Sequence, residues 1–104
     1  MVYTITLNPA IDYIVGVENL KFDDVNRTYE ETFCYGGKGI NVSAVLTRLG
    51  VKNKALGFAG GFTGRQLEKL LESDNIVCDF NYLENGNTRI NVKVKSQQNF
   101  EINS

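Results

Sequence analysis

The sequence contains no histidine, a single proline and two cysteines. Without histidine, a Ser-His-Asp or Cys-His catalytic arrangement is excluded. Cys34 and Cys78 lie far apart and form no CxxC pair, so a structural zinc site is excluded as well.

Long apolar runs and one-sided charge are also missing. No apolar run approaches the roughly 20 residues that a membrane-spanning helix needs. The 11 basic and 12 acidic residues balance, and neither sign forms the basic stripe that is typical of nucleic-acid-binding proteins. Residues 2–7 resemble a strand and not the start of a signal peptide. We expect a cytoplasmic protein with neither a membrane nor a nucleic acid as partner.

The 104 residues, 42% of them hydrophobic, suffice for one small core. In chain order the hydrophobic pattern predicts strands at 2–7, 13–17 and 27–35, a helix at 42–49, a strand at 54–59, a helix from Thr63, and strands at 77–83, 88–95 and 100–102. The β-α-β order predicts an α/β fold with a mostly parallel sheet, in which residues 2–7 are buried on both faces. Two helices are few for such a sheet, and we expect the chain to be part of a larger domain.

Both predicted helices have a hydrophobic stripe. In the first, Val42, Val45, Leu46 and Leu49 have the spacing of a buried face. In the second, Thr63 and Gln66 resemble a capping box, and Leu67 and the leucines after it form the apolar side.

Gly36, Gly37 and Gly39 surround Lys38 just before the first helix. Glycines allow positive φ angles and a close approach of a polar ligand, which predicts a loop here. The start of the following helix offers unpaired N–H groups. Together with Lys38, these groups favour an anion or a sugar hydroxyl as ligand.

Two nucleotide-binding motifs do not fit this stretch. Lys38 is followed by Gly39 where a Walker P-loop needs Ser or Thr, and Val42 stands at the last glycine of GxGxxG. The polar candidates that remain are Asp12, Lys38, Asn41 and Arg89. Carboxylates and amides hydrogen-bond to hydroxyls while cations pair with phosphate, so this set suits a phosphorylated sugar.

Several of these features also have a purely structural explanation. Asp12 could stabilise the turn after Asn8-Pro9, and Arg27 could be a solvated side chain at a strand end. The cationic residues of 89–95 could form the solvated face of an ordinary strand. Cys78 is expected to be a small buried hydrophobic residue without a redox role. The aromatic side chains of 27–35 predict a cover from another subunit or another part of the protein.

The stretch Gly36-Gly37-Lys38-Gly39-Ile40-Asn41-Val42-Ser43, followed by Gly50 and Gly60, resembles the first signature of the ribokinase-like (PfkB) sugar kinases. Residues 6–12 and 87–93 are similar to the branch that phosphorylates sugar phosphates, above all fructose 1-phosphate. The resemblance covers residues 1–104. It implies a ribokinase-like fold, with flanking helices on a mostly parallel sheet and a small antiparallel lid built from strands near 13–17, 27–35 and 88–103.

The resemblance also implies roles for the sugar end of the site. Asp12 would hold sugar hydroxyls, Gly37, Lys38 and Gly39 would shape the pocket, and Asn41 would hydrogen-bond to the sugar. In this family the lid covers the sugar and often forms a dimer contact. We therefore expect a homodimer through the lid strands.

The phosphate already present on the substrate would be bound by cations. The resemblance implies Arg89 for this role, together with Lys38. Arg27 is a weaker candidate for the same region.

The second signature of the family, which ends in its catalytic aspartate, does not occur in these residues, and neither do its ATP-binding loops. The resemblance implies that this aspartate lies beyond Ser104, so we predict no catalytic residue and no metal ligand in this chain.

The chain would be the substrate-side part of an enzyme that uses ATP and Mg²⁺ to convert fructose 1-phosphate into fructose 1,6-bisphosphate, and would be inactive alone. A tagatose-6-phosphate kinase and a non-catalytic binding or dimerisation module are the alternatives.

Overall fold

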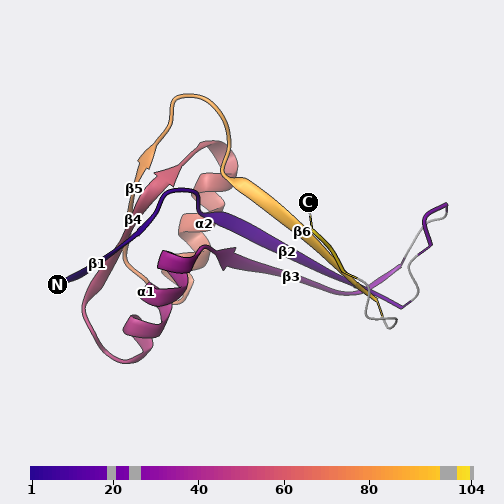
Figure 1. Ribbon diagram of the computed structural model, residues 1–104, viewed down its shortest axis with the longest axis horizontal. Coiled ribbons are helices and arrows are strands. Elements are labelled where there is room, and N and C mark those ends of the chain that lie inside the picture. Colours follow the sequence, from indigo (N-terminus) through magenta and orange to yellow (C-terminus); the bar gives the residue numbers. More distant parts are fainter. Residues whose placement is uncertain (19–20, 24–26, 97–100, 104) are drawn as a thin grey trace.

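The computed structural model describes residues 1–18, 21–23, 27–96 and 101–103. The described elements are, in chain order, β1 (Val2–Thr6), β2 (Ala10–Val17), β3 (Thr28–Gly36), α1 (Lys38–Arg48), β4 (Asn53–Ala59), α2 (Gly61–Ser73), β5 (Cys78–Tyr82), β6 (Arg89–Ser96) and β7 (Glu101–Asn103). They form a three-stranded sheet β1-β4-β5, here called the base sheet, and a four-stranded sheet β3-β2-β6-β7, here called the projecting sheet. Figure 1 shows the projecting sheet extending away from the helices and the base sheet.

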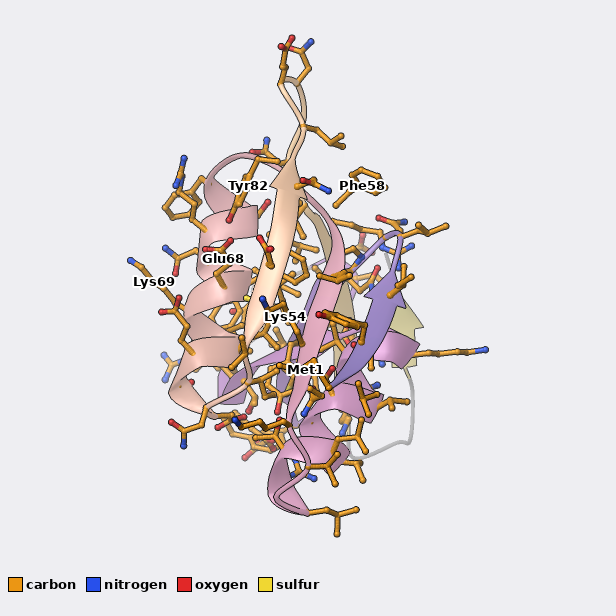
Figure 2. All side chains as sticks on the ribbon, turned by 90° about the vertical axis from the view of Figure 1, so that its left-hand side faces the viewer. Met1, Lys54, Phe58, Glu68, Lys69 and Tyr82 are labelled. Carbon is orange, nitrogen blue, oxygen red and sulfur yellow. The ribbon has the colours of Figure 1, made fainter. Side chains whose placement is uncertain are left out.

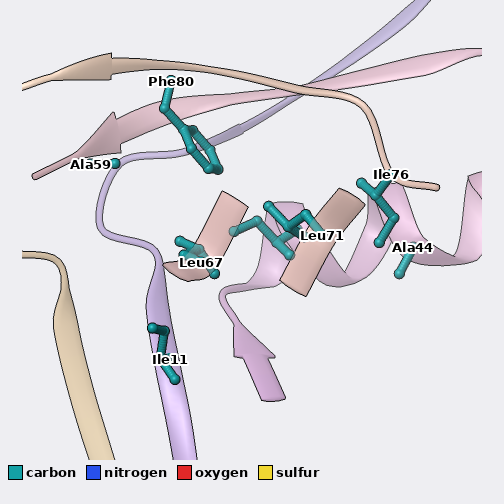
Figure 3. Close-up of a cluster of buried hydrophobic side chains, with 8 residues drawn as sticks. Ile11, Ala44, Ala59, Leu67, Leu71, Ile76 and Phe80 are labelled. Atoms are coloured by element: carbon teal, nitrogen blue, oxygen red, sulfur yellow. The ribbon is translucent and has the colours of Figure 1, made fainter. Parts of the chain in front are cut away.

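The base sheet is parallel throughout, as β-α-β connections require. Both helices lie on the same side of it, the side from which the projecting sheet extends (Figure 1). Fully buried Leu67 and Leu71 of α2 meet Ile40 of α1 and Phe80 of β5 in the core, part of which is drawn in Figure 3. The predicted α/β class with a mostly parallel sheet is confirmed.

The opposite face of the base sheet is open to solvent. Tyr3 is 58% exposed, Ile5 66% and Phe58 43%. Figure 2 looks onto this face, where Phe58 and Lys54 project from β4. The prediction that residues 2–7 are buried on both faces is wrong, because both helices pack on the other side.

The projecting sheet has one apolar and one polar face. β2 is its centre, antiparallel to β3 and parallel to β6, and β6 pairs antiparallel with β7. Tyr13 stacks on Phe33 on the apolar face, with ring centroids 4.5 Å apart. The predicted strand at 13–17 starts at Ala10, so Asp12 lies within a strand.

The hairpin predicted at the end of the sequence is described in part. The alternating strand at 88–95 is confirmed as β6, and β7 covers the later part of the predicted return strand. Phe100, where that strand was expected to begin, lies outside the described residues. Ser104, beyond which the catalytic aspartate of the family was expected, lies outside them as well. The position of that aspartate therefore stays a prediction.

Helix α1 begins at Lys38, inside the stretch predicted to be a loop. Its buried residues are Ile40, Ser43 and Ala44, whereas Val42 is 50% and Val45 49% exposed. The prediction of the buried face is therefore wrong. The helix turns its small residues to β1, because these allow the close approach at which the Ser43 and Thr4 hydroxyls hydrogen-bond at 2.5 Å.

Helix α2 begins at Gly61 with Gly60 as its N-cap and without a side-chain cap. The predicted capping box is wrong, because the Thr63 hydroxyl donates to the Thr88 carbonyl at 2.7 Å instead. The apolar face with Leu67 and Leu71 is confirmed. In the described part of the chain, neither helix has the length and hydropathy to cross a membrane.

Candidate functional site

Three segments that are distant in sequence meet at the base of the projecting sheet. Ala10, the first residue of β2, pairs with Gly36 at the end of β3 and with Arg89 at the start of β6. Gly36 is followed directly by Gly37, the N-cap of α1. The start of β2, the start of β6 and the start of α1 therefore lie together, close to the end of β1 (Figure 1).

Asp12 is held by two residues of β6. Asn91 Nδ2 donates to Asp12 Oδ1 at 3.0 Å, and Lys93 Nζ lies 4.0 Å from Asp12 Oδ2. On the β3 side a Cβ at Gly36 would stand 2.9 Å from Asp12 Oδ2, so a larger residue here would push the carboxylate out of its present position. The Asp12 side chain remains 20% exposed. Asp12 is thus part of a cross-strand polar cluster and does not stabilise the turn before β2.

The N-terminus of α1 is free of a side-chain cap and carries no acidic residue in its first turn. Gly37 has a φ of 125°, and a Cβ there would lie 2.7 Å from Thr6 Cγ2. A Cβ at Gly39 would lie 2.7 Å from the Ile5 carbonyl oxygen. The glycines therefore let the helix start close against β1. Its first N–H groups and the exposed Lys38 side chain provide positive charge for a ligand.

Thr88 anchors the start of β6. Its hydroxyl accepts from the Gly60 N–H at 3.0 Å, and its own N–H donates to the Gly60 carbonyl at 2.9 Å. Its carbonyl accepts from Thr63, as described above. Thr88 is buried, and the residue after it is the exposed Arg89. These hydrogen bonds fix the position at which β6 begins, and with it the position of Arg89. The sequence patterns did not indicate this role of Thr88.

The predicted site residues do not all converge. Asp12, Gly37, Gly39 and Arg89 surround the base of the projecting sheet, and exposed Asn41 lies in the first turn of α1. Arg27 directly precedes β3, whose first residue pairs with Val17 at the far end of β2. At about 3.4 Å per residue, Arg27 is roughly 30 Å along the strand from Gly36. Within one chain Arg27 is thus remote from the other candidates.

Asn91 and Lys93 are residues of the cluster that the sequence analysis did not select. Their only signal was the alternation of residues 89–95, which sorts them onto the same face as Arg89. Asn is uncommon within strands, where β-branched residues are preferred. An asparagine at position 91 of a predicted strand was therefore the one sequence signal that this side chain has a specific partner.

The cavities near these residues are small or apolar. One of about 90 Å³ lies at the carboxyl ends of the base strands and includes Pro9, Gly60 and Thr88 in its lining. Another of about 340 Å³ lies between the apolar face of the projecting sheet and α2, between Phe33 and Phe62. Ligand pockets usually measure about 300–1,000 Å³ and include polar groups. Neither of these two cavities is lined by Asp12, Asn91 or Lys93.

The potential metal ligands and the Cys78 thiol can be located among the described residues. Among residues 1–18, 21–23, 27–96 and 101–103, no group of three His, Cys, Asp or Glu side chains could hold a metal ion. Burial, with the charges of Glu68, Glu72 and Asp79, raises the pKa of the Cys78 thiol to about 11. Cys78 is therefore protonated at neutral pH and packs against the core, as expected for a structural residue.

Residues 1–103 match the protein family described as pfkB family carbohydrate kinase. The chain is 50% identical over 103 residues to the 1-phosphofructokinase of Bacillus subtilis. The aligned region covers 99% of this chain and 34% of that protein. The chain is 48% identical over 102 residues to the D-tagatose-1-phosphate kinase of Bacillus licheniformis. This alignment covers 98% of this chain and 33% of that protein.

A solved structure of a Staphylococcus aureus protein, assigned as a phosphofructokinase, has the same fold over the whole chain. The TM-score is 0.90 at 46% sequence identity, with 100% of this chain and 34% of that chain covered. The present chain thus spans about a third of the length of the proteins it matches. The chain has the fold of the corresponding third of the Staphylococcus aureus structure.

Proposed function

The chain belongs to the pfkB family of carbohydrate kinases, and we propose that it carries the sugar-phosphate-binding residues of a kinase acting on fructose 1-phosphate. The full-length enzyme would transfer a phosphoryl group from ATP and form fructose 1,6-bisphosphate. The name of the Bacillus subtilis relative, at 50% identity, supports this choice of substrate.

One observation carries the proposal. At the base of the projecting sheet, the hydrogen-bonded carboxylate of Asp12 lies near the positively charged residues Arg89 and Lys38. Asp12 offers acceptor atoms to sugar hydroxyls. Arg89 begins β6 on the same face as Asn91 and would bind the substrate phosphate with Lys38. Gly37 and Gly39 would let the sugar approach the backbone. In this arrangement the projecting sheet is the lid over the sugar.

Asn41 completes the proposed site. It is exposed in the first turn of α1, where its amide could hydrogen-bond to the sugar. Arg27 lies at the far end of β3. Within one chain it is not assigned to the phosphate.

Phosphoryl transfer itself is not assigned to this chain. The described residues contain no acidic cluster for Mg²⁺, so the metal and ATP would be bound by residues of the full-length enzyme, with the catalytic aspartate beyond Ser104. We expect the 104-residue chain to be inactive alone. Formation of fructose 1,6-bisphosphate from fructose 1-phosphate and ATP by the purified chain would contradict this.

Calorimetric titration of the chain with fructose 1-phosphate and with fructose tests the binding role. We expect the phosphorylated sugar to bind more tightly. Arg89→Met should remove this preference, because the guanidinium would pair with the phosphate, and Asp12→Asn should weaken binding of both sugars. Lys95→Met, further along the same face, is the matched control and should bind as the unchanged chain does. Equal affinity of the unchanged chain for both ligands would refute the proposal.

Tagatose 1-phosphate is the second candidate substrate. The Bacillus licheniformis relative named for it is 48% identical to this chain, nearly as similar as the 1-phosphofructokinase. The alternative substrate expected from the sequence was tagatose 6-phosphate. Titration with both tagatose phosphates distinguishes them, and we expect the 1-phosphate to bind more tightly, as it carries its phosphate at the same carbon as fructose 1-phosphate.

A homodimer through the lid is the proposed assembly. Phe33 is 57% and Ile90 41% exposed on the apolar face of the projecting sheet, and a second sheet could cover them. Light scattering should give the mass of a dimer, and Phe33→Asp should give a monomer. A dimer that binds no sugar phosphate would instead favour the non-catalytic dimerisation module.

A further inference from the structure

The Asp12 carboxylate is enclosed on three sides by residues that come from two strands. The parallel register places Asn91 directly beside Asp12 and Lys93 beside Ile14, one position further along the same face. The Asn91 amide occupies Oδ1 at 3.0 Å, and the Lys93 ammonium approaches Oδ2 at 4.0 Å. Gly36 closes the third side without a side chain. The remaining open direction leads to solvent.

Stability alone is a weak reason for this arrangement. The Lys93–Asp12 pair is partly exposed, and such pairs contribute little to the free energy of folding. Asn at the third position of β6 is disfavoured in a strand, where Thr or Val would fit better. Asn91 is unfavourable for the strand but donates a hydrogen bond to Asp12. Its presence is better explained by a function of the Asp12 carboxylate than by the stability of the strand.

We propose that Asn91 and Lys93 are positioning residues, which hold the Asp12 carboxylate in one rotamer before a sugar arrives. The amide fixes Oδ1, and the ammonium keeps Oδ2 from turning away, while the carboxylate stays partly exposed to solvent. Ordering a free side chain on binding costs affinity, and a carboxylate held in advance avoids that cost. The link to a sugar ligand rests on the proposed function; the positioning of Asp12 does not.

The first test is made without any ligand. Three-bond NMR couplings report the χ1 rotamers of Asp12 in the full 104-residue chain. We expect a single rotamer in the unchanged chain, averaging in Asn91→Ala, and partial averaging in Lys93→Met. Lys93→Arg should restore a single rotamer, and Lys95→Met, the same chemical change two positions further on, should have no effect. Asn91→Thr repeats the test with a residue that strands favour, should Asn91→Ala fail to fold.

A single Asp12 rotamer in the folded Asn91 variants would overturn the proposal, whatever their affinity for sugars. The second readout is the Kd for fructose 1-phosphate. We expect it to rise about 3- to 10-fold in Asn91→Ala, less in Lys93→Met, and to recover in Lys93→Arg. Averaged rotamers with an unchanged Kd would overturn the part of the proposal that concerns the ligand. Averaged rotamers in variants of a chain that binds no sugar phosphate at all would support the positioning of Asp12 and refute the proposed function.

Discussion

The two sheets of this chain differ in what they bury. The base sheet turns one face to α1 and α2, and nearly all of the buried hydrophobic core lies between them. Among the residues of the projecting sheet whose burial is described, Ile11 belongs to that cluster, and Ala10 and Val17 are buried outside it. Its polar face instead carries Asp12, Asn91 and Lys93. Under the proposed function, stability and ligand binding therefore belong to different sheets, and substitutions in the two sheets should have separable effects.

Truncation of a core residue in the base layer should have the largest effect. Leu71 is fully buried, and Leu71→Ala should lower the free energy of unfolding by about 2–5 kcal/mol through lost burial and the cavity left behind. Val94→Ala, at a half-buried position of β6, should cost less than about 1.5 kcal/mol. Urea denaturation measures both. Equal losses would break the assignment of stability to the base layer.

The junction between the sheets should be the next most sensitive place. Gly39→Ala would bring a Cβ against the Thr6 hydroxyl and within 2.7 Å of the Ile5 carbonyl oxygen. Relieving this overlap must shift α1 away from β1, so we expect a loss of about 1–3 kcal/mol in urea denaturation. The matched control Asn41→Ala, in the same helical turn but exposed, should stay within about 0.5 kcal/mol. A Gly39→Ala chain as stable as its control would contradict the close approach.

Alkaline pH should weaken the base layer through Cys78. The folded chain holds the thiol proton up to a pKa of about 11, against an ordinary value of 9.0. The unfolded chain therefore loses the proton first, and the stabilisation that is complete below pH 9 disappears as the pH approaches 11. Cys78→Ala should flatten the fall in unfolding free energy over this window, with Cys34→Ala as the control for loss of a thiol. Identical slopes in Cys78→Ala and the unchanged chain would refute the effect.

The smallest effect on stability is expected on the open face of the base sheet. Ile5 is 66% exposed there, so Ile5→Lys should change the unfolding free energy by less than about 0.5 kcal/mol. It should nevertheless reduce association at high protein concentration, because a charge interrupts the exposed apolar surface around Tyr3 and Phe58. Light scattering of Ile5→Lys beside Phe33→Lys compares the two sheets directly. Unchanged association in Ile5→Lys would leave the projecting sheet as the contact surface.

Local patterns predicted the elements of both sheets well. The alternation of residues 89–95 predicted β6 and its two unlike faces. The glycines with Lys38 predicted a loop that leads into a helix, and α1 does follow, although it already begins at Lys38. These signals succeed because strand and helix periodicity depend on neighbours in the sequence. The boundaries of α1 and α2 were less predictable, since Gly37 and Gly60 begin these helices without the side-chain caps that sequence patterns rely on.

The candidate site was predicted only in part. The sequence indicated Asp12, the glycines and Arg89 by their residue types and positions. It did not indicate Asn91 and Lys93, which contact Asp12. Asn91 is 79 positions from Asp12, and no local pattern indicates their hydrogen bond. Likewise the hydrophobic stripe of α1 favoured Val42 and Val45 as the buried face, yet Ser43 and Ala44 face the sheet because the helix packs close to β1.

By itself, then, the sequence determined the α/β class, the polar and apolar faces of β6, and the residue types at the start of α1. Each of these follows from side chains that are neighbours in the chain. The tertiary structure alone decided the register of β2 beside β6, the wall that Gly36 forms against Asp12, and the face that α1 buries. Those depend on which distant segments approach closely enough to exclude water, and on the space that each small residue leaves there.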